Sequence, residues 1–257
     1  MKTIVFDLDG TLTDSKEPLD EEMGSLLKKL LDTCVVTIVS GSSWKQIQKQ
    51  VIGRIKADVS LLHRLYFLPT SGSAMYQLWS KYGWIATYQH KLPRRDALRI
   101  IQAFEDVVKE TGFEPQKLWG KQIENRESQI TFSALGQNAP IEEKEAFDPD
   151  CSKRKALVEA LQKKITGYEI QISGCTSIDV TMKGTNKKYG VDELMKRLHI
   201  SKDDVIYVGN SIFKGGDDYV AIEMGLEYVQ VRDPEDTKKF IRDFLDASEV
   251  KALEKTG

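Results

Sequence analysis

The chain has 257 residues, of which 40% are apolar and 30% are charged, so it is long enough for one large domain or two smaller ones. Its 37 basic and 39 acidic residues leave a formal net charge of −2. Nucleic-acid-binding and membrane-surface proteins usually carry a basic excess, so neither partner is expected. No apolar run has the length of a membrane span, and Asp7 interrupts the first apolar run too early for a signal peptide.

The three cysteines are scattered, and the sequence contains no CxxC motif. A disulfide framework or a zinc site is therefore not expected. These features are typical of a reduced, cytoplasmic, globular protein, but they point to no particular activity.

The N-terminal part alternates short β-branched runs with amphipathic stretches, which is typical of a parallel sheet covered by helices. Strands are predicted at 3–6, 35–39 and 65–68, and helices at 20–31 and 43–51. Aromatic-rich runs at residues 71–90 then indicate antiparallel hairpins.

The middle part follows a helix–strand–strand order twice, which predicts an antiparallel sheet with two helices on one face. Its helices are expected after Pro93 and over 151–165, and its strands on both sides of Asn125-Arg126, at 168–172 and at 177–182. The C-terminal part returns to alternation, with helices at 187–198, 217–224 and 234–245 and strands at 204–208 and 227–231. We therefore predict an α/β fold, in which a Rossmann-like parallel-sheet core (1–80 with 184–257) carries an inserted α+β cap domain (81–183).

The strongest chemical signal is Asp7-Leu8-Asp9-Gly10-Thr11, directly after the first predicted strand. Ligands of parallel α/β sheets bind beyond the carboxyl ends of the strands, where Asp7 and Asp9 would lie. Two carboxylates there could hold a hard cation such as Mg²⁺, while Gly10 permits a close turn and Thr11 supplies a hydroxyl. The alternative interpretation is a solvated strand end with turn-forming aspartates.

Three further elements are expected at the same edge. Ser40 ends the second strand, where its hydroxyl could hold a phosphoryl oxygen or merely cap the next helix. Lys187 opens a helix, where a cation is unfavourable unless an anion lies nearby. Asn210 and the Asp217-Asp218 pair follow another strand, in a glycine-rich loop.

Together these residues are suited to metal-assisted phosphoryl transfer through an aspartyl phosphate. Asp7 would be the nucleophile and Asp9 the general acid and base. Mg²⁺ and Lys187 would neutralise the charge of the phosphate before attack.

The DxDGT start, Ser40, Lys187 and the Asn210 loop resemble the haloacid dehalogenase (HAD) superfamily of phosphohydrolases. Asn125-Arg126, the 177–180 run (Ser-Ile-Asp-Val) and the 187–189 run (Lys-Lys-Tyr) look like motifs of its Cof-type and phosphomannomutase-like branch. The resemblance implies catalytic residues Asp7, Asp9, Ser40 and Lys187, and Mg²⁺ held by Asp7, the Asp9 carbonyl and Asn210, with Asp217 or Asp218 in support. It implies substrate binding by Gly10, Thr11, Gly41, Arg126, Ser177 and Asp179.

The chain departs from the mutase pattern where mutases place arginines for a distal phosphate. It has Lys16, Gln137 and Lys144 at those positions, and only Arg126 is kept. Because a glutamine carries no charge and a lysine lacks the bidentate fork of arginine, the cap site looks weakened for phosphate. The sequence therefore favours a Mg²⁺-dependent phosphatase that acts on a small phosphorylated metabolite, with a sugar phosphate as the expected class. The first alternative is a phosphomannomutase.

Two other classes are left open by the residues. A DxD motif also occurs in metal-dependent glycosyltransferases, although the DGT context and Lys187 argue against one. A silent sugar-phosphate-binding protein would have no need of both Asp7 and Asp9. A homodimer is a further open prediction.

Overall fold

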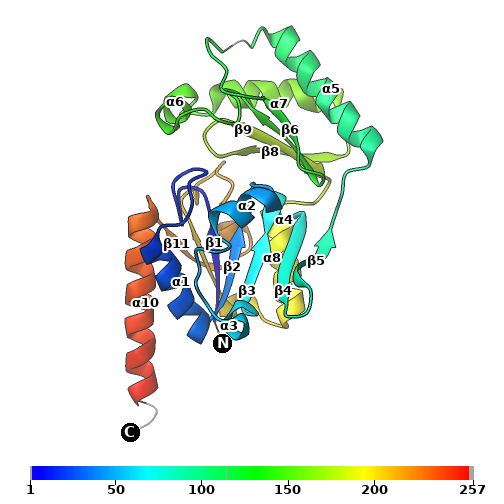
Figure 1. Cartoon of the computed structure of the whole chain (residues 1–257). Coiled ribbons are helices and arrows are strands. Elements are labelled where there is room, and N and C mark those ends of the chain that lie inside the picture. Colours follow the sequence, from blue (N-terminus) through cyan, green and yellow to red (C-terminus); the bar gives the residue numbers. More distant parts are fainter. Residues whose placement is uncertain (1, 114, 255–257) are drawn as a thin grey trace.

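The computed structural model describes residues 2–113 and 115–254. Its larger sheet has seven strands in the order β11-β10-β1-β2-β3-β4-β5 (Figure 1). These strands are β1 (Thr3–Asp7), β2 (Val35–Val39), β3 (Leu65–Leu68), β4 (Ala74–Trp79), β5 (Gly83–Gln89), β10 (Val205–Gly209) and β11 (Glu227–Gln230). Strands β11 to β3 run parallel, and β4 and β5 are added antiparallel at one edge. The predicted α/β class with a parallel-sheet core is confirmed.

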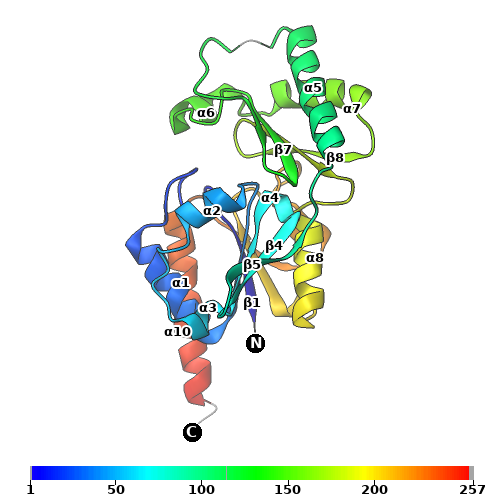
Figure 2. The same cartoon turned by 45° about the vertical axis from the view of Figure 1, so that its right-hand side comes forward.

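Helices cover both faces of this sheet (Figures 1 and 2). One face carries α1 (Glu21–Thr33), α2 (Trp44–Gln50), α3 (Val59–Leu62) and α10 (Pro234–Glu254), and the other carries α8 (Lys187–Leu198) and α9 (Val220–Glu223). Along β1, Phe6 packs into the first layer and Val5 into the second, and both are fully buried. Burial on both faces explains why these strands are almost continuously apolar in sequence.

A second, four-stranded sheet is antiparallel, with the order β6-β7-β9-β8. Its strands are β6 (Ile123–Asn125), β7 (Gln129–Ser133), β8 (Tyr168–Ser173) and β9 (Ser177–Met182). Helices α5 (Arg94–Thr111) and α7 (Ser152–Lys164) pack on one face, where Phe104 stacks on Phe132 at 5.3 Å between ring centroids. The opposite face looks toward the carboxyl ends of the parallel strands (Figure 2).

The β4–β5 hairpin crosses the predicted domain boundary. The boundary at 80/81 lies in the turn of this hairpin, and β5 pairs with β4 in the seven-stranded sheet. The sequence indicates the hairpin but not the sheet that it joins, because either sheet offers a free edge. The domain division itself stays a prediction.

The remaining elements differ modestly from the predicted ones. Helix α3, helix α6 (Ile141–Phe147) and the 3-10 turn η1 (Lys202–Asp204) were not expected, and α9 is shorter than the predicted helix 217–224. Helix α10 continues beyond the predicted end at 245. Among the residues that the structure describes, none of the helices combines the length and apolar character that crossing a bilayer requires.

The turn labelled α4 (Pro69–Gly72) is not a right-handed helix. Thr70 and Ser71 have φ values of 48° and 54°, and Gly72 follows with a φ of 80°. Left-handed backbone costs about 1–2 kcal/mol for a residue with a Cβ, so the surrounding structure must hold it in place. The Thr70 and Ser71 amides donate to the carbonyls of Ser42 and Ser40, at 2.9 Å each. This turn therefore fixes the loop that follows β2.

Candidate active site at the carboxyl ends of the parallel strands

Three adjacent parallel strands bring the predicted residues to one edge of the seven-stranded sheet. Asp7 ends β1 and is in register with Val39 at the end of β2, so Ser40 follows at the same level. On the other side of β1, β10 ends at Gly209 and Asn210 follows. Register in the sheet thus explains why residues distant in sequence meet.

Lys187 lies at the centre of an acidic cluster. Its ammonium nitrogen (Nζ) lies 2.8 Å from Asp7 Oδ1, 2.8 Å from Asp217 Oδ2 and 2.7 Å from Asp218 Oδ1. Lys187 is only 1% exposed. The Asn186 side chain caps α8 by accepting from the Tyr189 amide at 3.0 Å, which sets where this helix begins. The three carboxylates are the anionic partner expected for a cation in the first turn of a helix.

Burial and charge oppose each other within this cluster. Burial alone lowers the pKa of Lys187, but the carboxylates of Asp217, Asp218 and Asp7 outweigh it and hold this pKa well above its ordinary value. Burial raises the pKa of Asp7, and repulsion from Asp218 and Asp217 adds to it, while Lys187 acts in the opposite direction. The cluster contains two more carboxylates than it can neutralise with its single ammonium group. It is therefore a favourable place for an additional cation.

The same carboxylates have the geometry of a candidate metal site. Asp7, Asp217 and Asp218 each offer an oxygen within 4.8 Å of the others. Asn210 lines the same cavity as Asp7 and Asp217, and its side-chain amide packs against Gly10, where a Cβ would collide with it. Gly10 also has a φ of 84°, so both its conformation and its surroundings require glycine. An oxygen-rich, negatively charged donor set fits a hard divalent cation such as Mg²⁺.

Asp9 points away from the acidic cluster. Its Oδ1 accepts hydrogen bonds from the Lys16 amide at 2.7 Å and from Gln50 Nε2 at 3.3 Å, and its Oδ2 accepts from Ser42 Oγ at 3.2 Å. Asp7 and Asp9 therefore have different environments, as a nucleophile and a proton donor require.

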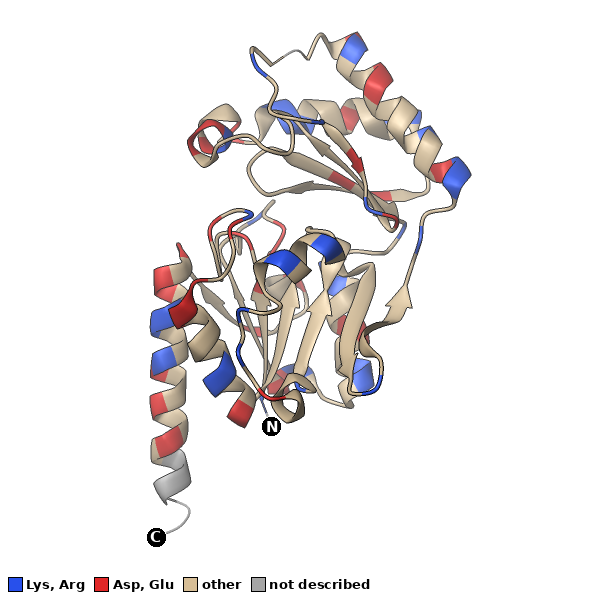
Figure 3. Ribbon diagram, in the orientation of Figure 1, with Lys and Arg blue, Asp and Glu red and all other residues tan. Residues whose placement is uncertain are grey.

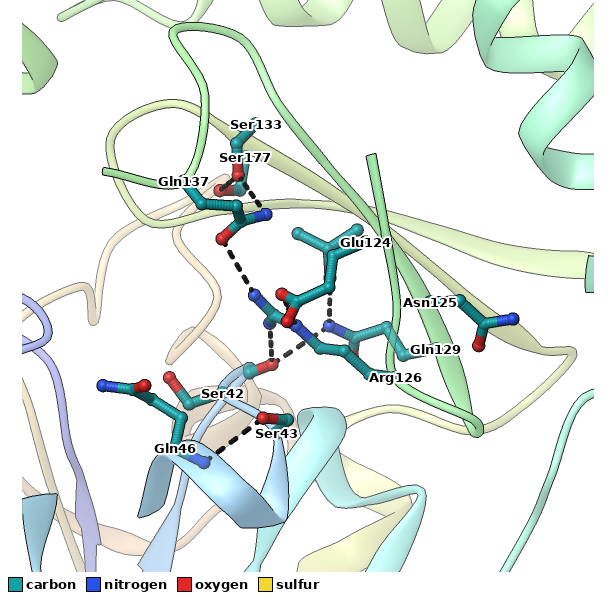
Figure 4. Close-up of polar contacts among 12 residues, drawn as sticks. Ser42, Ser43, Gln46, Glu124, Asn125, Arg126, Gln129, Ser133, Gln137 and Ser177 are labelled. Carbon is teal, nitrogen blue, oxygen red and sulfur yellow. Dashed lines mark hydrogen bonds and ion pairs between the residues drawn. The ribbon is translucent and has the colours of Figure 1, made fainter. Parts of the chain in front are cut away.

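Ser40 does not cap α2. Ser43 does so, by accepting from the Gln46 amide at 3.3 Å (Figure 4), so the helix-cap interpretation of Ser40 is wrong. Ser40 is 2% exposed, and its Oγ accepts from the Ser42 amide at 3.0 Å. Its hydroxyl proton is thus available to a ligand oxygen.

A cavity of about 480 Å³ separates this edge from the four-stranded sheet, and most of the predicted residues line it. Those lining it are Asp7, Asp9, Gly10, Ser40, Gly41, Arg126, Ser177, Asn210 and Asp217. Lys187, Asp218 and Asp179 lie behind the wall, where each is at most 2% exposed. A larger cavity of about 750 Å³ lies beside α5, α6 and α7, but no predicted site residue lines it.

Thr11 is not brought to the cavity. It is fully buried, and its hydroxyl has no hydrogen-bond partner among the described residues. The backbone turns tightly after Gly10, with the amides of Thr11, Leu12 and Thr13 all directed at the Leu8 carbonyl. This turn rotates the Thr11 side chain into the protein and away from a ligand.

A cluster of cations from both parts of the chain lines the same cavity, with Lys16 in the loop after β1 and Arg126 and Lys144 in the four-stranded part. Lys16, Arg126 and Lys144 all line the cavity, together with Gln137. Gln137 Oε1 accepts from Lys16 Nζ at 3.0 Å and from Arg126 Nη2 at 3.5 Å. Burial, and then repulsion from Lys144 and Arg126, lower the pKa of Lys16 to about 8. The shared contacts of Lys16 and Arg126 with Gln137 bring these two positive charges to one part of the cavity.

Several polar partners in the site had no signal in the sequence. Gln50 and Ser42 hold Asp9, and Tyr207 donates from its hydroxyl to Asp218 Oδ1 at 2.6 Å. Arg154 is 2% exposed and binds Asp148 at 2.8 Å, and both residues line the cavity. These residues sit in ordinary helix, strand and loop segments, so only the packing of elements reveals their role.

Comparison with known proteins adds a family. The sequence model of the family "Eukaryotic phosphomannomutase" matches residues 23–247. The phosphomannomutase of Saccharomyces cerevisiae is 25% identical over 257 aligned residues, which cover 94% of this chain and 93% of the yeast protein. Human phosphomannomutase 1 is 28% identical and covers 84% of this chain and 80% of its own.

Solved structures support the fold. A Plasmodium falciparum IMP-nucleotidase aligns with a TM-score of 0.67 at 18% identity, covering 94% of this chain and 67% of its own. A trehalose-6-phosphate phosphatase related protein aligns with a TM-score of 0.55 at 16% identity. The alignment covers 97% of this chain and 99% of that protein. The resemblance to the HAD superfamily is confirmed, and the family match favours a mutase over the phosphatase that the sequence alone ranked first. The chain belongs to the eukaryotic phosphomannomutase family, a group of phosphoryl-transfer enzymes with the HAD fold.

Proposed function

We propose that this protein is a phosphomutase that interconverts mannose 1-phosphate and mannose 6-phosphate. One observation carries the proposal: the acidic cluster around Asp7 and the cations Lys16, Arg126 and Lys144 border the same cavity. A mutase passes through a sugar bisphosphate, so it needs a second anion site besides the reacting one. The family match supports the same function.

The reaction follows from the positions of Asp7 and Asp9. Lys187 binds Asp7 Oδ1, and a carboxylate oxygen of Asp7 attacks a phosphorus atom of the sugar bisphosphate. The P–O bond to the sugar breaks, and protonated Asp9 gives its proton to the leaving sugar oxygen. In the reverse step Asp9 removes the proton from a hydroxyl of the monophosphate, whose oxygen takes the phosphoryl group back from Asp7.

Mg²⁺, held by Asp7, the Asp9 carbonyl and Asn210, with Asp217 or Asp218 in support, would offset the repulsion between the carboxylate and the phosphate when it is bound. Ser40 would donate its hydroxyl to a phosphoryl oxygen. Arg126, Lys16 and Lys144 would bind the distal phosphate and Ser177 a sugar hydroxyl, while Asp179, predicted to bind the sugar, lies buried behind the cavity wall and could act only through its neighbours.

The test is conversion of mannose 1-phosphate in the presence of Mg²⁺ and a hexose 1,6-bisphosphate. We expect wild-type activity and at least about a thousandfold loss in Asp7→Asn, because the neutral amide has the same shape but cannot attack. Asp243→Asn is the control, since this exposed aspartate pairs with Lys239 on the surface of α10. Wild-type protein without mutase activity, or full activity in Asp7→Asn, contradicts the proposal.

A phosphatase that acts on a sugar phosphate is the second candidate, and Gln137 favours it. This neutral amide lies between Lys16 and Arg126, at the place where the mutase pattern has an arginine. Steady release of inorganic phosphate from a hexose monophosphate, without isomerisation, would identify a phosphatase.

We also propose that the four-stranded sheet and its helices form a cap domain of the Cof-type branch, inserted into the core. Keeping the β4–β5 hairpin whole moves the first boundary from 80 to about 90, and the second stays near 184. The cytoplasmic location and the homodimer remain predictions.

A further inference from the structure

Two side chains of the four-stranded side converge on one carbonyl group of the loop after β2. Arg126 Nη1 donates to the Gly41 carbonyl oxygen at 2.6 Å, and Gln129 Nε2 donates to the same oxygen at 3.0 Å (Figure 4). Gly41 lies between Ser40 and Ser42, which face the reaction site. These two hydrogen bonds join the two sheets directly above the phosphoryl-binding loop.

Gln129 belongs to a buried relay of hydrogen bonds. Its Nε2 also donates to Thr131 Oγ1 at 2.8 Å, and Thr131 Oγ1 donates to Asp179 Oδ1 at 2.7 Å. Thr131 and Asp179 are in register on neighbouring strands, and Gln129 is fully buried. A Cβ on Gly41 would stand 3.0 Å from Asp179 Oδ2, so the relay lies in close contact with the loop. The position of β7 over Gly41 is thus fixed by hydrogen bonds at both ends of the relay.

Arg126 and Gln129 differ in how strongly a phosphorylated substrate would compete for their hydrogen bonds. Arg126 lines the cavity and also binds Glu124 at 2.7 Å, so its guanidinium donors are shared among several acceptors. A phosphate dianion accepts a charge-assisted hydrogen bond more strongly than a neutral carbonyl does, and it competes for Arg126. Gln129 does not line the cavity, and its neutral amide gains little from an anion. When Arg126 turns to a phosphate, Gln129 keeps its bond to Gly41.

We propose that Gln129 is a positioning residue that holds the four-stranded sheet closed over the Ser40–Ser42 loop while Arg126 binds the distal phosphate. This inference rests on the proposed phosphoryl transfer. A closed cavity keeps water from the phosphorylated Asp7, so the phosphoryl group passes to the sugar. Loss of the Gln129 bond would open a path for water and convert part of the transfer into hydrolysis.

The test is Gln129→Leu, compared with Gln122→Leu. Leucine is similar in size to glutamine and suits the buried position of Gln129. The change also removes the Gln129 amide oxygen, which lacks a hydrogen-bond partner among the described residues. Gln122 donates to the Ala134 carbonyl at 2.9 Å, a contact within the four-stranded part alone. We expect Gln129→Leu to raise the ratio of phosphate release to isomerisation by about five- to tenfold, the effect of losing one net hydrogen bond. We also expect a higher KM for the sugar phosphate, whereas Gln122→Leu changes neither quantity.

A second measurement needs no turnover. Amide hydrogen exchange of the Ser40–Ser43 loop, without substrate, should be several-fold faster in Gln129→Leu than in wild type or Gln122→Leu. Unchanged exchange, or an unchanged ratio of hydrolysis to isomerisation, overturns the role of Gln129. If wild type isomerises no hexose phosphate but the loop exchanges faster in Gln129→Leu, the proposed function fails while the closing contact stands.

Discussion

Charge balance at single residues decides most of the chemistry of this site. The formal charge of the whole chain is only −2, yet the acidic cluster at Lys187 and the cations Lys16, Arg126 and Lys144 are gathered around one cavity. An anionic substrate responds to these local groups, because exposed charges elsewhere are screened within about 10 Å. A near-neutral composition is therefore compatible with a phosphorylated ligand.

Replacing Lys187 by methionine tests the balance of the acidic cluster. The change leaves Asp7, Asp217 and Asp218 buried without their shared cation, and breaking a buried ion pair in this way costs about 3–5 kcal/mol. We expect the free energy of unfolding, measured with urea, to fall by about this amount. Because a divalent cation can replace the missing charge, added Mg²⁺ should restore part of the loss.

Lys188→Met is the matched control, since Lys188 is the next residue of α8 and is exposed. Its unfolding free energy should stay within about 0.5 kcal/mol of wild type, with or without added Mg²⁺. Equal stability of the two variants would mean that Lys187 does not neutralise the cluster. Absence of any Mg²⁺ effect in Lys187→Met would argue against a metal site at these carboxylates.

The sequence predicts that Asp7 and Lys187 lie together in the site, but not which residues hold them. Asp7 and Lys187 stand at a strand end and a helix start, where their charges are conspicuous. Gln50 sits on an ordinary helix and Tyr207 in an apolar strand, and each gains its role only through packing. The predicted Thr11 hydroxyl failed to reach the cavity because a local turn rotates it inward.

Among the elements, a close contact between α8 and the left-handed turn after β3 connects two parts of the site. A Cβ on Gly190 of α8 would stand 2.8 Å from the Cα of Gly72, so the two backbones touch. The same helix carries Lys187, and the same turn holds the Ser40 loop. The contact therefore sets the distance between Lys187 and Ser40.

Gly190→Ala should disturb catalysis more than stability alone explains. The added methyl group separates α8 from the turn and displaces Lys187 from Asp7, at a cost of about 1–3 kcal/mol in the free energy of unfolding. We expect kcat to fall at least about tenfold, with a smaller change in KM, because the reacting groups are misplaced while the cations of the four-stranded side are not. Steady-state kinetics at a temperature where the variant is fully folded measures both quantities.

Gly24→Ala is the control for this prediction. A Cβ on Gly24 of α1 would stand 2.4 Å from the Arg54 carbonyl oxygen, so this variant is also overpacked, but against no site residue. We expect comparable destabilisation with unchanged kcat in the folded protein. A similar kcat for both variants would show that the Gly72–Gly190 contact serves folding alone.

Strong periodicity made most elements predictable, and weak local patterns caused the errors. The predicted strand 35–39 coincides with β2 and the predicted helix 187–198 with α8. Helix α6 starts after Pro140 and is mostly charged, so its sequence shows no apolar face. Asp217 and Asp218 stay in the loop before α9 because they turn toward Lys187, which shortens the predicted helix.

At the scale of the whole molecule, the site exists only because two sheets face each other. The seven-stranded sheet supplies the reacting groups, and the four-stranded sheet supplies Arg126 and Gln137 (Figure 3 shows the charged residues of both parts). The sequence predicts both sheets from their patterns, but no pattern reports how far apart they lie or which side chains meet between them. Lys16 comes from the loop after β1 and meets Gln137 across 121 positions of sequence.

The choice between mutase and phosphatase depends on this meeting of the two parts, and Gln137→Arg tests it. An arginine there adds a bidentate phosphate donor beside Lys16, Arg126 and Lys144. Burial, and then repulsion from Lys144 and Arg126, already lower the pKa of Lys16. Repulsion opposes the added cation in the free protein, whereas a bound phosphate dianion neutralises it. We therefore expect affinity for a hexose 1,6-bisphosphate to rise about tenfold, the value of one charge-assisted hydrogen bond.

Calorimetric titration of the bisphosphate into each variant measures this affinity, and the share of turnover that ends in isomerisation should rise with it. Gln137→Leu is the control: it removes the contacts to Lys16 and Arg126 without adding charge, so it should not tighten binding. If Gln137→Arg weakens binding instead, repulsion among four cations exceeds the gain from phosphate. The distal phosphate would then bind elsewhere, because a phosphate that lies among Lys16, Arg126 and Lys144 must also attract a fourth positive group.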